Sequence, residues 1–198
     1  MDIKETKQLA EKLHEGQFRA DGQVPYIMHP KMVASLVQRY GGSERCQRLA
    51  FLHDVLEENI EGFCRLNGCP GSYSKFKILT LAHKKELPLV NDIIFDLIKI
   101  TDTWESDQCE IQERGKVWYL SKLLITANHD VLLVKLCDMA ANIIESEGSR
   151  LSQEKRYLKA VECLEMSDRK DLTEQHKQLI IDIKSIVNRH IAEKKNEK

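Results

Sequence analysis

The chain has 198 residues, of which 42% are hydrophobic and 31% are charged, and its formal net charge is −1. This composition is typical of soluble globular proteins of one domain, and no apolar run approaches the ~18 residues that a membrane span requires. Because 30 Lys and Arg balance 31 Asp and Glu, the chain lacks the broad basic field that binds a nucleic-acid backbone, so an anionic ligand must be held in a local pocket.

The apolar residues recur at helical spacing along most of the chain, which predicts an all-α fold. The first helix is expected over 3–17, and the N-terminus "MDIKETKQLAEKLHEG" is typical of such a helix rather than of a signal peptide, so we expect a cytoplasmic protein. A second helix should start at Pro30, and Ser43 should cap the third. The glycine-rich segment 60–74 is predicted to be a loop. The third and later helices are expected over 44–58, 75–84, 89–102, 111–127, 130–146, 152–166 and 172–194.

The stretch "LAFLHDVLEEN", which begins at Leu49, places His53 and Asp54 inside an apolar helical run. Burying an ionised carboxylate costs several kcal/mol unless an ion pair, hydrogen bonds or a metal compensates its charge. An arginine such as Arg48 or Arg19 is one possible partner for Asp54. A bound metal is the other.

A second polar stripe lies in the apolar segment "VLLVKLCDMAANII", where Lys135, Asp138 and Asn142 follow one another at i, i+3 and i+7. A further candidate is His29, at the junction of a loop and a helix. Imidazole and carboxylate groups together suit Mn, Fe, Co or Zn rather than Ca or Mg. From the residues alone, a metal site and an ordinary set of hydrogen-bonded core residues both remain open.

Three segments of the chain resemble one known family. "AEKLHEGQFRADGQVPYIMHPKMVASLV", "LAFLHDVLEEN" and "LLVKLCDMAANI" are similar, in this order, to motifs of the HD hydrolase domain in RelA/SpoT-type enzymes and their small single-domain relatives, which hydrolyse the alarmone (p)ppGpp. The resemblance implies one HD-superfamily helical bundle over 1–198, with the motif core at about 10–145 and C-terminal helices over 150–194. It also implies a hydrolase that removes the 3′-diphosphate of a small nucleotide, giving GDP or GTP and pyrophosphate.

The resemblance also implies roles for individual residues. One divalent metal, Mn in most of the family, would be bound by His29, His53, Asp54 and Asp138. The residues implied in catalysis are Glu57, Glu58 and Asn142. The residues implied in substrate binding are Arg19, Lys135 and Tyr157.

Several positions depart from the family pattern. Glu58 stands where the family usually has Asp, and Met139 and Ala141 replace residues that carry cationic or hydrogen-bonding groups. One alternative is therefore an HD phosphohydrolase for another nucleotide, and another is a regulator that binds a nucleotide without hydrolysing it. A second metal would need further histidines between the HD pair and Asp138, where His83 and His129 are the candidates. The oligomeric state is left open.

Overall fold

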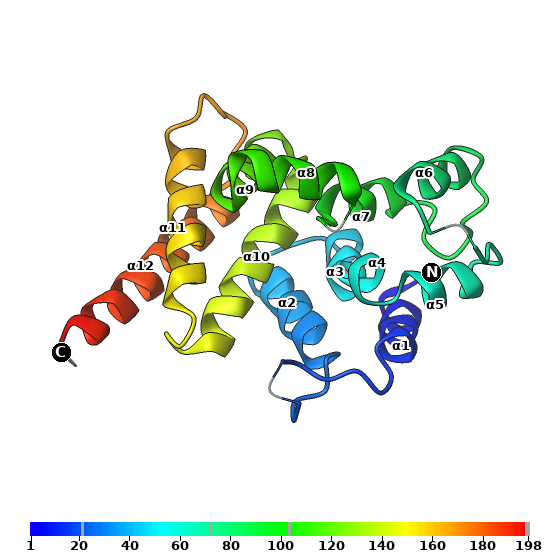
Figure 1. Cartoon of the computed structure of the whole chain (residues 1–198), viewed down its shortest axis with the longest axis horizontal. Coiled ribbons are helices and arrows are strands. Elements are labelled where there is room, and N and C mark those ends of the chain that lie inside the picture. The colour runs from blue at the N-terminus through cyan, green and yellow to red at the C-terminus, as the bar shows by residue number, and fades with distance from the viewer. Residues whose placement is uncertain (21, 72, 103, 197–198) are drawn as a thin grey trace. The chain divides into compact units, whose positions relative to one another are not determined.

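The computed structural model describes residues 1–20, 22–71, 73–102 and 104–196, and Figure 1 traces the helices that these residues form. Apart from an isolated β-bridge between Phe18 and Pro25, the regular structure of the described residues is helical. The all-α prediction is confirmed. Within the described ranges, no helix has both the length and the apolar run needed to cross a bilayer.

The chain divides into two compact units, a first unit over Met1–Glu105 and a second unit over Ser106–Lys198. Each is described here by itself, and the expectation of one domain over 1–198 stays a prediction. The first unit contains α1 (Ile3–Leu13), α2 (Met28–Arg39), α3 (Glu44–Leu52), α4 (Val55–Glu58), α5 (Ile60–Leu66), α6 (Lys75–His83) and α7 (Ile94–Ile100). The second unit contains α8 (Glu105–Arg114, which begins at the boundary), α9 (Lys116–Thr126), α10 (His129–Ser146), α11 (Leu151–Glu165) and α12 (Glu174–Asn196).

The core of the first unit forms around α3, which packs against α1, α2 and α7. Leu49 and Leu52 are fully buried there, and burial of such side chains contributes roughly 1.5–3 kcal/mol each. Ser43 caps α3 as predicted, because its hydroxyl accepts a hydrogen bond from the Cys46 N–H at 3.1 Å. The Arg48 guanidinium, one of the predicted partners of Asp54, binds both oxygens of Asp92 at 2.8 Å instead.

The expected third helix over 44–58 is wrong in one respect, because it is two helices. α3 ends at Leu52 and α4 begins at Val55, so His53 and Asp54 form the junction between them. The apolar spacing continues through this junction, so periodicity could not reveal it. Asp is a weak helix former, and at this position its side chain binds groups outside the helix.

The expected loop over 60–74 is also wrong in part, since its first half is helix α5. The Asn59 side chain caps this helix by accepting the Gly62 N–H at 2.9 Å. A Cβ built on Gly62 would lie 2.7 Å from the Asn59 amide, so this glycine serves close packing rather than a turn. The true loop begins after α5, where Gly68 and Gly71 have φ values of +73° and +80° that favour glycine.

Other helix ends also differ from the expectation. α1 stops at Leu13 rather than at residue 17, and α7 begins at Ile94 rather than at residue 89. The single helix expected over 111–127 is replaced by α8 and α9, which meet at Gly115 with a φ of +87°. The predicted helices over 75–84, 130–146, 152–166 and 172–194 agree with the structure to within about two residues at each end.

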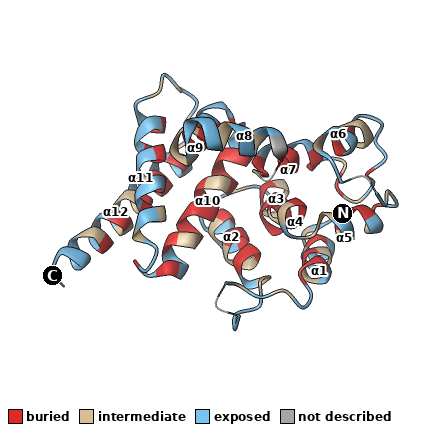
Figure 2. Ribbon diagram, in the orientation of Figure 1, coloured by how far each residue is buried: buried red, intermediate tan, exposed pale blue. Residues whose placement is uncertain are grey.

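In the second unit α10 packs against α9 and α12, and α11 packs against α9 and α12. Figure 2 shows buried residues along most of α10, as expected for a helix that is apolar on most of its circumference. α11 and α12 are joined by a buried pair, because Nδ1 of His190 lies 2.8 Å from Oε2 of Glu154. Lys135, Asp138 and Asn142, the polar stripe of α10, thus lie on a helix whose other residues are mostly apolar and buried.

Candidate metal centre

His29 lies in the first turn of α2, which begins at Met28, two residues before the predicted start. Pro30 fits this turn because the first N–H groups of a helix have no acceptor within it. The His29 side chain is buried, with 2% of its surface exposed. The start of α2 thus carries a buried imidazole.

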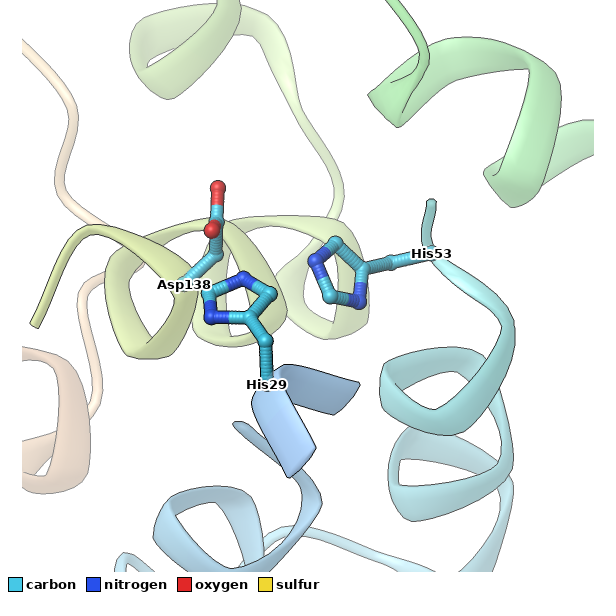
Figure 3. A group of neighbouring side chains, drawn as sticks. All are labelled: His29, His53 and Asp138. Carbon is cyan, nitrogen blue, oxygen red and sulfur yellow. The ribbon is translucent and has the colours of Figure 1, made fainter. Parts of the chain in front are cut away.

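His53 follows the last residue of α3, and its ring lies close to that of His29, with 5.4 Å between the ring centroids (Figure 3). Nδ1 of His53 lies 2.8 Å from the carbonyl oxygen of Ala50. Because a carbonyl only accepts, Nδ1 must carry the proton, and Nε2 of a neutral ring then carries the lone pair. This is the arrangement that orients a metal-binding histidine.

Asp54 places its carboxylate between the two histidines. Its Oδ1 lies 3.0 Å from Nε2 of His53, and its Oδ2 lies 3.8 Å from Nε2 of His29. A lone pair on Nε2 and a carboxylate oxygen repel each other at this distance unless positive charge lies with them, as a second imidazole proton or a cation. The chemistry of this donor set therefore fits a transition-metal ion.

The Tyr26 hydroxyl donates a hydrogen bond to Oδ2 of Asp54 at 2.8 Å. Burial is the main cause that raises the pKa of Tyr26 far above its ordinary value, and the negative charges of Asp54 and Glu58 raise it further. The hydroxyl therefore keeps its proton and acts as a donor. The Arg19 guanidinium lies over the Tyr26 ring at 5.3 Å from its centroid, within the range of a cation–π contact.

The two acids of α4 occupy different environments. Glu57 is half-buried, and its Oε1 accepts a hydrogen bond from the Asp102 N–H at 3.0 Å. Glu58 is exposed, and its backbone carbonyl accepts from Nε2 of Gln17 at 3.1 Å. Glu57 is thus oriented by a backbone N–H of the segment that follows α7. This contact could not be predicted from the sequence.

In the second unit, the predicted stripe on α10 is a connected set. Nζ of Lys135 lies 2.8 Å from Oδ2 of Asp138, and the amide of Asn142 donates to Oδ1 of Asp138 at 2.7 Å and to its carbonyl at 3.0 Å. Asp138, drawn on α10 in Figure 3, is buried. Both partners therefore hold this carboxylate, a role different from the substrate contact that the resemblance implies for Lys135.

Tyr157 on α11 is also buried, and its hydroxyl accepts a hydrogen bond from Nε2 of Gln153. Burial is the main cause that raises the pKa of Tyr157, and the negative charge of Asp138 adds to it while Lys135 opposes it.

The histidines proposed for a second metal have other surroundings. His83 is exposed, and its ring lies against Phe95 with 5.0 Å between the centroids. Nε2 of His129 lies 2.9 Å from Oδ2 of Asp171 on the surface of the second unit. Each of these exposed histidines thus has a partner within its own unit.

Three residues around the centre were not among those predicted from the sequence: His14, Gln17 and Tyr26. The His14 ring stacks on that of Tyr26, with 4.9 Å between the centroids and an interplanar angle of 22°. Nδ1 of His14 lies 2.7 Å from Oε1 of Gln17. All three lie in the block "HEGQFRADGQVPYI" that carries the resemblance, so their presence in the matched motif was the available signal.

No family model matches the sequence. A guanosine-3′,5′-bis(diphosphate) 3′-pyrophosphohydrolase of Borreliella burgdorferi is 29% identical over 139 residues, which cover 69% of this chain and 18% of the relative. A protein of the same name from Haemophilus influenzae is 29% identical over 161 residues, or 80% of this chain and 20% of the relative. A probable enzyme of this name from Synechocystis sp. is 48% identical over 46 residues, or 23% of this chain and 6% of the relative.

The chain thus spans about a fifth of the length of the first two relatives. The resemblance inferred from the motifs is confirmed by these similarities.

Proposed function

We propose that this chain is a metal-dependent hydrolase that removes the 3′-diphosphate of (p)ppGpp, giving GDP or GTP and pyrophosphate. Its similarity to three proteins that bear the name of this activity supports the proposal. The observation that carries it is the 3.0 Å approach of Nε2 of His53 to the Asp54 carboxylate, which calls for positive charge at this point.

In this proposal His29, His53 and Asp54 bind one divalent ion, with Asp138 as a fourth ligand and Mn²⁺ as the expected metal. The hydrogen bond to Ala50 gives His53 the tautomer that a metal ligand needs. Asn142 supports the proposed role of Asp138, because its amide holds the buried carboxylate in one orientation. When bound, such an ion lowers the pKa of a water molecule and offsets charge on phosphoryl oxygens.

Glu57 takes the proton of the attacking water in this mechanism. The hydrogen bond from the Asp102 N–H holds its carboxylate in one orientation. Glu57 is the third residue of the short helix α4, which follows the junction that carries His53 and Asp54. Glu58, which is exposed beside it, would help to orient the same water. An exposed carboxylate keeps more freedom, so we assign it the smaller effect.

The remaining predicted residues are assigned to the nucleotide. Arg19 and Lys135 are cations that suit a phosphate or a guanine base, and Tyr157 offers an aromatic ring and a hydroxyl. Asn142, which already binds Asp138, would orient the sugar or a phosphate. These contacts decide which nucleotide is accepted.

The test is incubation of the purified protein with Mn²⁺ and ppGpp, followed by chromatography of the nucleotides and a pyrophosphate assay. We expect equimolar GDP and pyrophosphate, complete loss with excess EDTA and recovery when Mn²⁺ is restored. His53→Ala should abolish the reaction, whereas His129→Ala, at an exposed histidine, should leave it unchanged.

A panel of nucleoside mono-, di- and triphosphates separates the alternatives. Hydrolysis of a plain nucleotide without hydrolysis of ppGpp would replace the proposed substrate. Tight ppGpp binding without turnover, at any Mn²⁺ concentration, would favour a regulator and contradict the proposed activity.

A further inference from the structure

The hydroxyl of Tyr26 contacts a proposed metal ligand, although the resemblance implies no role for this residue. We infer that Tyr26 is a positioning residue that fixes the Asp54 carboxylate for metal binding, and that His14 and Gln17 hold Tyr26 in place. This inference rests on the proposed metal centre and extends it to three residues of the first unit.

The first step concerns the orientation of Asp54. Its Oδ2 accepts from the Tyr26 hydroxyl at 2.8 Å, while its Oδ1 lies 3.0 Å from Nε2 of His53. A carboxylate side chain has a broad terminal torsion, so the hydrogen bond at Oδ2 restricts the rotation of its plane. Tyr26 supplies this hydrogen bond from a segment 28 positions earlier in the chain.

The second step concerns the position of the Tyr26 ring. One neighbour is the His14 imidazole, stacked at 4.9 Å, and another is the Arg19 guanidinium, 5.3 Å from the ring centroid. Stacked and cation–π contacts each restrict the plane of an aromatic ring. These two contacts therefore restrict the orientation of the ring whose hydroxyl binds Asp54.

The third step concerns His14 itself, of which 2% is exposed. Nδ1 donates to Oε1 of Gln17 at 2.7 Å, and among the described residues no hydrogen-bond partner meets the buried Nε2. Burial is the main cause that lowers the pKa of His14, so the ring is neutral and Nε2 carries only a lone pair. The hydrogen bond at Nδ1 fixes the His14 ring, and its face is stacked on the Tyr26 ring.

The fourth step concerns Gln17, which contacts His14, Tyr26 and the last residue of α4. Its backbone carbonyl accepts from the Tyr26 N–H at 2.9 Å, and its side-chain amide donates to the Glu58 carbonyl at 3.1 Å. The amide thus links the His14 ring to α4, the helix that follows the His53 and Asp54 junction. Displacing Gln17 should disturb His14, Tyr26 and α4 together.

The test measures Mn²⁺ affinity by titration calorimetry at a temperature where every variant is folded by circular dichroism. Tyr26→Phe removes only the hydroxyl, and we expect its Mn²⁺ dissociation constant to rise about 10- to 100-fold, as is usual when a residue that orients a metal ligand is lost. The control is Tyr73→Phe, the same change at an exposed tyrosine, which should bind Mn²⁺ like the wild type. His14→Leu and Gln17→Leu should weaken binding in the same direction but less.

A second measurement asks whether Tyr26 acts through Asp54. In an Asp54→Ala background, Tyr26→Phe should change the Mn²⁺ dissociation constant by less than about twofold, because the accepting carboxylate is already gone. An equally large effect in both backgrounds would overturn the inference. So would wild-type Mn²⁺ affinity in Tyr26→Phe, even if its melting temperature fell, because that pattern marks a purely structural residue.

These results are separable from the fate of the proposed activity. If the wild type binds Mn²⁺ but does not hydrolyse ppGpp, the proposed reaction fails, and loss of Mn²⁺ affinity in Tyr26→Phe still supports the inference. If the wild type hydrolyses ppGpp and Tyr26→Phe keeps its metal affinity, the inference alone fails. A wild-type protein that binds no divalent metal overturns both.

Discussion

The pair of Lys135 and Asp138 on α10 allows a quantitative prediction for Lys135→Met. Methionine keeps an unbranched chain of similar length and removes the ammonium that lies 2.8 Å from Asp138. The side chains are 12% and 8% exposed, so little water is available to replace the lost cation. Breaking a buried pair by removing one partner costs about 3–5 kcal/mol. The two hydrogen bonds from Asn142 remain, which places the expected cost near 3 kcal/mol.

The measurement is thermal unfolding of the metal-free protein in EDTA. For chains of this length, 1 kcal/mol corresponds to about 2–4 °C, so Lys135→Met should lower the melting temperature by roughly 6–12 °C. The chain offers a control in Lys177→Met, because Lys177 and Glu174 form an i, i+3 ion pair at 2.7 Å on α12, with the acid before the lysine. Those side chains are 54% and 87% exposed, and exposed pairs contribute about 1 kcal/mol at most.

Mn²⁺ affinity is a second measurement on Lys135→Met, and here the substitution should not weaken the property that is measured. If Asp138 is a ligand, a cation need not compete with the Lys135 ammonium in Lys135→Met, so the variant should bind Mn²⁺ at least as tightly as the wild type. Mn²⁺ at 100 times its dissociation constant adds about 2.7 kcal/mol of stability, which should recover most of the loss. A melting temperature equal to that of Lys177→Met would refute the calculated cost, and weaker Mn²⁺ binding would refute the competition.

Three further predictions test other parts of the chain. Glu57→Gln should lower ppGpp turnover at least about 100-fold while leaving Mn²⁺ affinity nearly unchanged, and a pyrophosphate-release rate near that of the wild type would exclude Glu57 as the base. Burial lowers the pKa of His176 below its unfolded value of about 6.5, so the unfolded state binds more protons as the pH falls. The free energy of unfolding, measured in urea, should therefore decrease as the pH is lowered from about 7 to about 5. The decrease should be smaller in His176→Gln, and an equal decrease in this variant and the wild type would contradict the prediction. Asn59→Ala loses both the cap of α5 and the 2.7 Å hydrogen bond to the Leu13 carbonyl, so it should cost about 2 kcal/mol in urea unfolding, whereas Asn59→Ser should keep a cap and lose only the second bond. Equal stability of the two Asn59 variants would show that the cap of α5 contributes nothing beyond the bond to Leu13, which would contradict the prediction.

The residue types of the candidate centre could be predicted from the sequence, whereas the contacts between these residues could not. His53 and Asp54 were selected because polar groups in an apolar helical run need compensation, and the structure places them together with His29. The resemblance implies a substrate contact for Lys135, and the structure adds an ion pair between Lys135 and Asp138. The spacing i, i+3 allowed that pair, but only the geometry shows that the two side chains meet.

The sequence by itself determined the all-α fold, most of the helices and the residue types of the centre, because helical periodicity and side-chain chemistry are local properties. Only the tertiary structure decided where the third helix breaks and why Gly62 belongs to a helix. It alone brought the Tyr26 hydroxyl to Asp54 and the Asn59 amide to the Leu13 carbonyl, contacts that span 28 and 46 positions of the chain. Contacts across such separations depend on how helices pack, and packing is a property of the whole folded unit rather than of any short segment.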